Sequence, residues 1–367
     1  MEPLVPLSLK AASGIDTPAL LIDLDALERN IAKMARHFQG KSVRLRPHAK
    51  THKCPEIARL QMEAGAIGVT CQKLGEAEAL AEAGLDHILI SNEVVDPAKI
   101  KRLVALAGKV DVMVAVDDPA NVRALSDAAS AEGVELKVLV EVNVGLNRCG
   151  VPPGEPALRL AQTVAASRGL VFEGLIGYEG HTVFVKSLPE RRRLCSQAVA
   201  SLVATKELLE ARGLAVPVVS GGGTGTYMIT GEYPGVTEIQ PGSYVFMDAT
   251  YATVEGVDFE QSLTVLSTVI SRPTPERAVI DAGLKSLSTD MGPPKVKGLQ
   301  GAELTRLSEE HGILRLEGEA QRLKPGDRVE LLPSHCCTTV NLFDRYHCVR
   351  NGSLDKIWAI AARGKSQ

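Results

Sequence analysis

Hydrophobic and β-branched residues occur in short runs along the first two thirds of the chain, and helical patterns follow most of these runs. Such runs, bounded by Gly, Pro, Asn or Asp, are typical of strands. Eight strands are expected on this basis, at residues 43–48, 67–71, 87–91, 110–116, 136–143, 171–178, 216–220 and 237–247. Repeated strand–helix units favour a parallel sheet, and eight of them favour a closed (β/α)8 barrel over an open doubly wound sheet.

The segments between the strands carry ordinary helix patterns. One helix is predicted by an apolar stripe at helical spacing, formed by Leu24, Leu27, Ile31, Met34 and Phe38. Two more are expected to begin at Asp96-Pro97 and Asp118-Pro119. In each pair the aspartate can cap the helix and the proline suits its first turn.

The pattern changes after about residue 255, where short β runs are broken by Gly and Pro. These runs lie at residues 263–270, 278–281, 328–332 and 356–361. We therefore expect a barrel domain at residues 17–255 and a mainly β domain formed by residues 1–16 and 256–367. The strand-like run at residues 19–23 is one strand too many for the barrel, so it is also a candidate for the β domain.

Composition narrows the class of protein. The 367 residues are 45% hydrophobic and only 4% aromatic, which allows a large aliphatic core. With 44 acidic and 41 basic residues and no charged block, neither nucleic acid nor a membrane surface is expected as a partner. The first residues do not resemble a signal peptide, and no apolar run approaches the ~18 residues of a membrane span. A cytoplasmic protein with reduced thiols is expected from this and from the odd number of cysteines, 7.

The segment Arg46-Pro47-His48-Ala49-Lys50-Thr51-His52 carries the first candidate chemistry. Lys50 follows the first predicted strand and is flanked by two histidines. A lysine amine there can form a Schiff base with an aldehyde once burial and nearby positive charge lower its pKa. The segment therefore suggests pyridoxal 5'-phosphate (PLP) chemistry, although an ordinary surface lysine at a strand–helix junction would have the same neighbours.

Other unusual residues also follow predicted strands. Residues 145–150 (GLNRCG) follow the fifth strand, 178–181 (YEGH) the sixth and 220–226 (SGGGTGT) the seventh. The loops after the strands of a (β/α)8 barrel meet at one end, where the chemistry takes place. These residues and Lys50 are therefore expected to form one site.

The glycine-rich loop has the composition of an anion cradle, because glycines let backbone N–H groups approach a phosphate and hydroxyls add donors. Its candidate cofactor contacts are Ser220, Gly222, Gly223 and Thr224. The loop lacks the ending of a nucleotide P-loop. A tight turn that closes a barrel strand is the alternative.

Four further side chains are candidates for the same site. Arg148 can donate to the phenolic oxygen of PLP, and Gln240 is placed on the eighth strand to face the pyridine nitrogen. A neutral amide cannot hold the ring protonated, so the cofactor would be a weaker electron sink than one paired with a carboxylate. Tyr178 and His181 are candidate acid–base or substrate-contact residues. A salt-bridged arginine, a core amide, a core tyrosine and a structural histidine are the alternatives.

A second cluster, Pro333-Ser334-His335-Cys336-Cys337, suggests a metal site. On a strand, His335 and Cys337 would face the same side and Cys336 the other. Two protein ligands leave positions for water and substrate, which suits a catalytic metal. A thiolate with an imidazole favours Zn²⁺ over Mn²⁺ or Mg²⁺. Buried thiols beside a hydrogen-bonded histidine are the alternative.

Six segments form a combination more specific than any one of them. They are residues 17–25 (TPALLIDLD), 46–53 (RPHAKTHK), 220–224 (SGGGT), 240–244 (QPGSY), 281–285 (DAGLK) and 310–312 (EHG). Together they resemble the D-threonine aldolase and D-serine dehydratase family, the PLP fold-type III group that shares the alanine racemase barrel. The resemblance implies a barrel with a β domain, usually as a homodimer, and PLP on Lys50. It also implies a divalent metal near the substrate β-hydroxyl, held by His335 and Cys337.

Within this family, aldolases typically carry His-x-Asp at the metal pair and dehydratases His-x-Cys, so Cys337 resembles the dehydratases. Residues 244–248, 344–347 and 349–352 look more like the aldolases. We expect a lyase that cleaves D-β-hydroxy-α-amino acids to glycine and an aldehyde. The alternative is deamination of D-serine or 3-hydroxy-D-aspartate to a 2-oxo acid and ammonia. A racemase would need a second base opposite Lys50, and a PLP carrier protein would not need the β domain; both are ranked lower.

Overall fold

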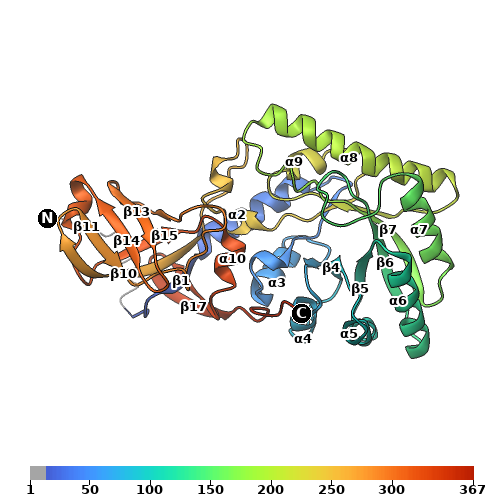
Figure 1. Cartoon of the computed structure of the whole chain (residues 1–367), viewed down its shortest axis with the longest axis horizontal. Helices are drawn as coiled ribbons and strands as arrows, with labels where there is room; N and C mark the ends of the chain where they lie inside the picture. The colour runs from blue at the N-terminus through green and yellow to red at the C-terminus, as the bar shows by residue number, and fades with distance from the viewer. Residues whose placement is uncertain (1–13) are drawn as a thin grey trace.

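The computed structural model describes residues 14–367 and contains two sheets, shown on opposite sides of Figure 1. The first sheet is parallel and has the strand order β2-β9-β8-β7-β6-β5-β4-β3. Its strands are β2 (Arg44–Leu45), β3 (Val69–Cys71), β4 (Ile88–Glu93), β5 (Val112–Val116), β6 (Leu136–Glu141), β7 (Leu170–Ile176), β8 (Val218–Gly221) and β9 (Glu238–Ile239).

The first and last strands of that order are joined, so the sheet closes. Ile67 N donates to Leu45 O at 2.9 Å and Thr70 N to Pro47 O at 2.8 Å. A parallel bridge pairs His48 with Thr70. The predicted closed (β/α)8 barrel is therefore confirmed.

The helices cover the outside of the barrel. They are α2 (Leu24–Phe38), α3 (Pro55–Glu63), α4 (Leu74–Glu82), α5 (Pro97–Ala107), α6 (Pro119–Glu132), α7 (Glu155–Ala166), α8 (Leu188–Ala211) and the short α9 (Tyr227–Thr230). The predicted caps are confirmed, because Asp96 accepts hydrogen bonds from Ala98 N and Lys99 N. Asp118 caps α6 in the same way. Of the described helices, none is both long and apolar enough to cross a membrane.

One strand prediction was wrong in extent. The run 237–247 is a strand only at Glu238–Ile239, and a 3-10 turn follows at Ser243–Val245. Pro241 cannot donate to a sheet ladder, which ends the strand. The apolar residues after it are fully buried in the core cluster that runs through both domains. Burial, rather than strand formation, explains their hydrophobicity.

The second sheet contains nine strands in the described chain, with β1 (Ala19–Asp23) inside it. Its other strands are β10 (Leu263–Thr274), β11 (Arg277–Ile280), β12 (Lys295–Val296), β13 (Ala302–Leu307), β14 (Gly312–Leu316), β15 (Arg328–Leu332), β16 (Arg345–Arg350) and β17 (Ser353–Ala359). β1 pairs antiparallel with β10 and parallel with β16. The assignment of residues 1–16 to this domain falls largely on residues 1–13, which lie outside the described residues.

The two sheets meet through a shared core. Figure 1 shows the short helix α10 (Cys336–Val340) between the barrel and the second sheet. Its buried Cys336 and Val340 belong to a cluster that also holds Phe246 and Tyr346, whose ring centroids are 5.7 Å apart. This junction brings residues near the C-terminus up to the open end of the barrel.

Candidate active site

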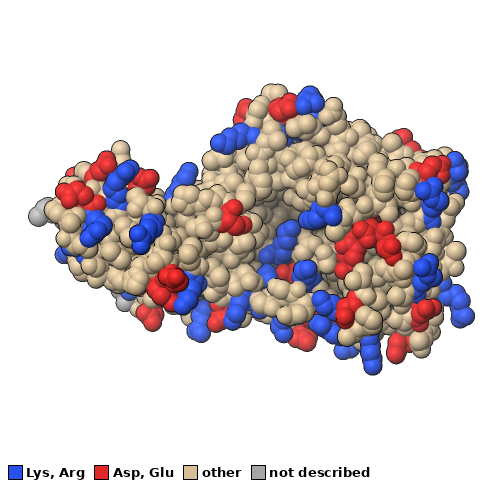
Figure 2. Space-filling model, in the orientation of Figure 1, with Lys and Arg blue, Asp and Glu red and all other residues tan. Residues whose placement is uncertain are grey.

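A cavity lies at the ends of the barrel strands and encloses about 600 Å³ of empty space, its open mouth included. The predicted residues that line it are Lys50, Arg148, Tyr178, Gly222, Gly223, Thr224 and Gln240. The molecular surface is hollowed near the middle of the face in Figure 2, and basic side chains gather on the wall of that hollow. Seven candidates separated by up to 190 positions thus share one space.

Lys50 lies in a 3-10 turn, Ala49–Thr51, just after the first barrel strand. Burial lowers its pKa, and the nearby Arg148 guanidinium lowers it further, while Cys337 opposes the shift. The flanking histidines do not supply the expected positive charge. Burial lowers the pKa of His52 to about 4 and that of His48 well below its usual value, so both are neutral.

The glycine loop approaches other backbone and side-chain atoms too closely to carry side chains. A Cβ on Gly221 would come within 2.5 Å of Gly177 O, and one on Gly223 within 3.2 Å of the Tyr178 hydroxyl. Gly222 has φ +76°, a conformation that favours glycine. The result is a concave backbone segment open to the cavity.

A buried carboxylate that the sequence analysis did not single out holds this loop. Glu179 accepts hydrogen bonds from Gly222 N (3.2 Å), Thr226 Oγ1 (2.6 Å) and Thr230 Oγ1. It is fully buried beneath the loop. Glu179 lies in the 178–181 segment, which the sequence already indicated as part of the site. Its role, however, depends on contacts with residues more than 40 positions away.

Arg148 and Tyr178 face each other at the cavity wall, with the guanidinium carbon 5.9 Å from the ring centroid. Arg148 makes no ion pair with any described residue. Burial raises the pKa of Tyr178, so its hydroxyl is a hydrogen-bond donor rather than a base at neutral pH. Its position against Gly223 favours cofactor binding over proton abstraction.

Two acidic side chains near Arg148 were also missed. Burial, and then the neighbouring Glu93, raise the pKa of Glu141 to about 8. The two carboxyls therefore do not both carry a full negative charge beside Arg148 at neutral pH. Glu93 and Glu141 end strands β4 and β6, so the rule that active-site residues follow barrel strands would have found them.

The remaining barrel predictions divide between the cavity wall and positions behind it. Gln240 Nε2 donates to Ser220 Oγ at 2.6 Å, so Ser220 holds Gln240 from behind and does not itself line the cavity. His181 is exposed and also does not line the cavity. Its ring lies against Gly145, on the loop that carries Arg148.

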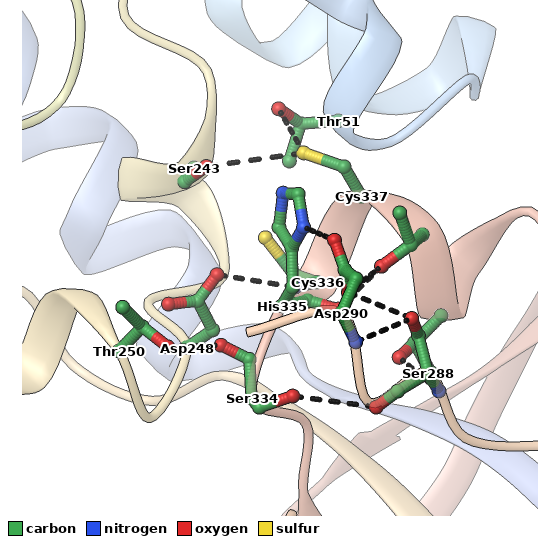
Figure 3. A network of polar contacts seen from close by, with 12 residues as sticks. Thr51, Ser243, Asp248, Thr250, Ser288, Asp290, Ser334, His335, Cys336 and Cys337 are labelled. Carbon is green, nitrogen blue, oxygen red and sulfur yellow. Dashed lines mark hydrogen bonds and ion pairs between the residues drawn. The ribbon is translucent and has the colours of Figure 1, made fainter. Parts of the chain in front are cut away.

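The metal pair is not on a strand, so that part of the prediction was wrong. His335 is extended, and Cys336 begins helix α10, with its N–H donated to the Asp248 carboxylate at 3.1 Å. Pro333 and this cap end the strand and start the helix. Cys336 is fully buried, whereas Cys337 is half-buried and its sulfur lies 3.3 Å from Thr51 Oγ1 (Figure 3).

His335 and Cys337 form a pair of opposite charges. The Cys336 thiol and His335 lower the pKa of Cys337 well below its usual value. Burial opposes protonation of His335, but Cys337 and Asp290 outweigh it and raise the pKa of His335 to about 9. A metal ion would displace the ring proton that faces Cys337, and the resulting imidazole and thiolate are a ligand set that Zn²⁺ prefers. No third His, Cys, Asp or Glu of the described chain completes a cluster with them.

Comparisons with known proteins agree with this arrangement. Residues 22–250 match the model of the alanine racemase N-terminal domain, and residues 262–349 match a putative serine dehydratase domain. The chain is 42% identical to D-threonine aldolase of Arthrobacter sp. (96% of this chain, 94% of the relative). It is 41% identical to 3-hydroxy-D-aspartate aldolase of Paracoccus denitrificans (96% and 93%).

Two solved structures have the same architecture. D-threonine aldolase from Filomicrobium marinum superposes with a TM-score of 0.93 at 44% identity, covering 95% of this chain and 96% of that one. D-threo-3-hydroxyaspartate dehydratase from Delftia sp. HT23 gives 0.87 at 32% identity, covering 94% and 97%. A cysteine-to-alanine mutant of that dehydratase was determined in the metal-free form.

The fold and these relatives define a lyase of the alanine racemase-like group, whose family uses PLP. Within that group, this chain belongs to the family that includes D-threonine aldolase and 3-hydroxy-D-aspartate aldolase.

Proposed function

We propose that this protein is a PLP- and divalent-metal-dependent aldolase that cleaves the Cα–Cβ bond of D-β-hydroxy-α-amino acids to give glycine and an aldehyde. One observation carries the proposal. Thr51, the neighbour of Lys50, lines the cavity and lies 3.3 Å from the Cys337 sulfur. Cys337 therefore lies directly behind the wall of the cavity that holds Lys50, which supports a reaction that uses the lysine and a metal ion on one substrate.

The cavity fits PLP. Lys50 would bind its aldehyde, the Gly222–Thr224 backbone its phosphate, Arg148 its phenolic oxygen and Gln240 its ring nitrogen. PLP bound there would withdraw electrons from the substrate Cα and weaken the bond aligned with its π system.

The chain's own residues have separate tasks. The lowered pKa of Lys50 keeps more of its amine neutral and nucleophilic. Arg148, which is not paired with a carboxylate, provides a positive charge for the phenolic oxygen or the substrate. Tyr178 would offer its hydroxyl as a hydrogen-bond donor beside the loop, and Gln240 would contact the ring without protonating it. The amide at Gln240 makes this a weaker electron sink than a site with a carboxylate.

The metal half would be held by His335 and Cys337. A divalent ion there would lower the pKa of the substrate β-hydroxyl. We propose Zn²⁺, because a thiolate ligand with a lowered pKa favours a borderline-soft ion over Mn²⁺ or Mg²⁺. We propose further that the enzyme acts on a small-molecule D-amino acid as a homodimer, as the family resemblance implies, and that it does so in the cytoplasm, as the sequence features and cysteines suggest.

The experiment is product analysis with D-threonine, with and without added metal ions. Glycine and acetaldehyde support the aldolase. Cys337 favours a second candidate, a dehydratase, because His-x-Cys resembles the dehydratase pair. That activity would release ammonia and 2-oxobutanoate from the same substrate, so one assay separates the two.

A further inference from the structure

Asp290 contacts the metal pair from outside the barrel. It lies in the loop between β11 and β12, on the second domain. Its Oδ2 is 2.6 Å from His335 Nδ1. Figure 3 shows this contact on one side of the imidazole, while the other ring nitrogen points toward Cys337 and Thr51.

The Asp290 carboxylate is itself held in place. Its Oδ1 accepts hydrogen bonds from Ser288 Oγ at 2.7 Å and from Thr338 Oγ1 at 2.9 Å. Thr338 lies on α10, three residues after His335, so the helix that follows the histidine also fixes its partner. Ser334 Oγ donates to Ser288 O at 3.3 Å and ties the loop to the same segment.

This arrangement selects one tautomer of His335. As a metal ligand His335 must be neutral, and because a carboxylate accepts hydrogen bonds and does not donate them, the remaining ring proton then belongs on Nδ1. The lone pair is then on Nε2, the nitrogen on the Cys337 side. Histidine ligands of metals commonly donate their other ring N–H to a carboxylate, which fixes the ring and makes it a better ligand.

We infer that Asp290 is a positioning residue of the metal site, which sets the tautomer and ring orientation of His335 so that Nε2 and Cys337 bind one ion. The inference rests on the proposed metal site. Asp290 is not itself a ligand, because its carboxylate lies across the ring from Nε2 and forms no cluster with His335 and Cys337 among the described residues.

The test measures metal affinity rather than turnover. Purified PLP-containing protein is freed of metal and titrated with Zn²⁺ against a chromophoric chelator, and with Co²⁺ to follow the thiolate charge-transfer band. The variants are Asp290→Ala, Asp290→Asn, Thr338→Val, His335→Ala and Cys337→Ala. Asp355→Asn, on exposed strand β17, is the matched control.

Asp290→Ala is expected to weaken Zn²⁺ binding about 10–100-fold, the range for losing such a partner. It should also shift the Co²⁺ band while the metal-free protein still folds and unfolds in one cooperative transition. Asp290→Asn keeps an acceptor oxygen and should recover part of the affinity. Thr338→Val should cost less than Asp290→Ala, and Asp355→Asn should bind as wild type.

Wild-type Zn²⁺ affinity in Asp290→Ala would overturn the inference. Loss of Co²⁺ binding as complete as in His335→Ala would also overturn it, because Asp290 would then be a ligand. If His335→Ala and Cys337→Ala both bind Zn²⁺ as wild type, the proposed metal site fails, and the inference fails with it for a different and recognisable reason.

Discussion

The two halves of the site are built in different ways. The cofactor half consists of residues that directly follow parallel strands, so the barrel places them together whatever their distance along the chain. The metal half consists of a short helix, a loop between two strands and Asp248, which caps that helix from the barrel domain. One half follows from topology, whereas the other depends on particular contacts between domains.

The first prediction tests the cofactor half by removing Lys50 and leaving the metal half intact. Lys50→Ala should reduce lyase activity to background, because no other described lysine lines the cavity. The variant should still bind Zn²⁺ with wild-type affinity. In the wild-type enzyme, borohydride should fix PLP to the peptide that contains Lys50. The same labelling is expected in the control variant Lys285→Ala, because Lys285 is exposed and lies outside the cavity. Labelling of a different peptide would remove the cofactor assignment.

The second prediction tests the metal half by removing the metal and leaving the cofactor bound. Exhaustive chelation should abolish activity, and so should Cys337→Ala. The substitution should also weaken Zn²⁺ binding by more than about 100-fold, which exceeds the loss expected for a residue such as Asp290 that contacts a ligand but not the metal. The PLP absorbance should remain. Cys336→Ala should keep the metal and lower the free energy of unfolding by about 1 kcal/mol, a typical value for one substitution. Equal loss of metal in both cysteine variants would contradict the assignment of Cys337 as the ligand.

The third prediction concerns charge in the cofactor half. Arg148→Leu should lower kcat/KM roughly 100-fold, the scale for removing one preorganised donor. Because Arg148 lowers the pKa of Lys50, its removal should raise that pKa. The pH dependence of PLP incorporation, which requires the neutral amine, should therefore move to higher pH. A profile that does not move would show that Arg148 does not act on Lys50.

The fourth prediction tests the support of the glycine loop. Glu179→Gln removes the charge that accepts hydrogen bonds from Gly222 N, Thr226 Oγ1 and Thr230 Oγ1, and it places an amide donor against these donors. The free energy of unfolding should fall by about 1–3 kcal/mol. PLP should dissociate more readily, as measured by dialysis and absorbance. Zn²⁺ affinity should not change, and a matching loss of metal would mean that the two halves are not independent.

The smallest effect is expected at His181. Since its ring is exposed and does not line the cavity, His181→Ala should lower kcat by less than the roughly 100-fold that removal of a general base causes. A larger loss, with a changed pH–rate profile, would instead support the acid–base role considered for it.

The same contrast explains what could be predicted from the sequence. The strand and helix pattern predicted the barrel, and the rule that active-site residues follow strands located Lys50, Arg148 and the glycine loop. Glu141 and Glu179 obey that rule too, but their importance depends on burial, which the pattern does not reveal. Asp290 had no local indication, because its role arises from a contact across 45 positions. The strand predicted at His335–Cys337 was wrong because Asp248, 88 positions away from Cys336, caps a helix there.

The central claim is that the cofactor half and the metal half act together on one D-β-hydroxy amino acid. Quantifying the products from D-threonine, in PLP-containing enzyme with and without Zn²⁺, tests it most directly. Equal amounts of glycine and acetaldehyde, formed only with metal and not from L-threonine, are the predicted result. Ammonia and 2-oxobutanoate as the main products, or full aldol cleavage after exhaustive chelation, would contradict it.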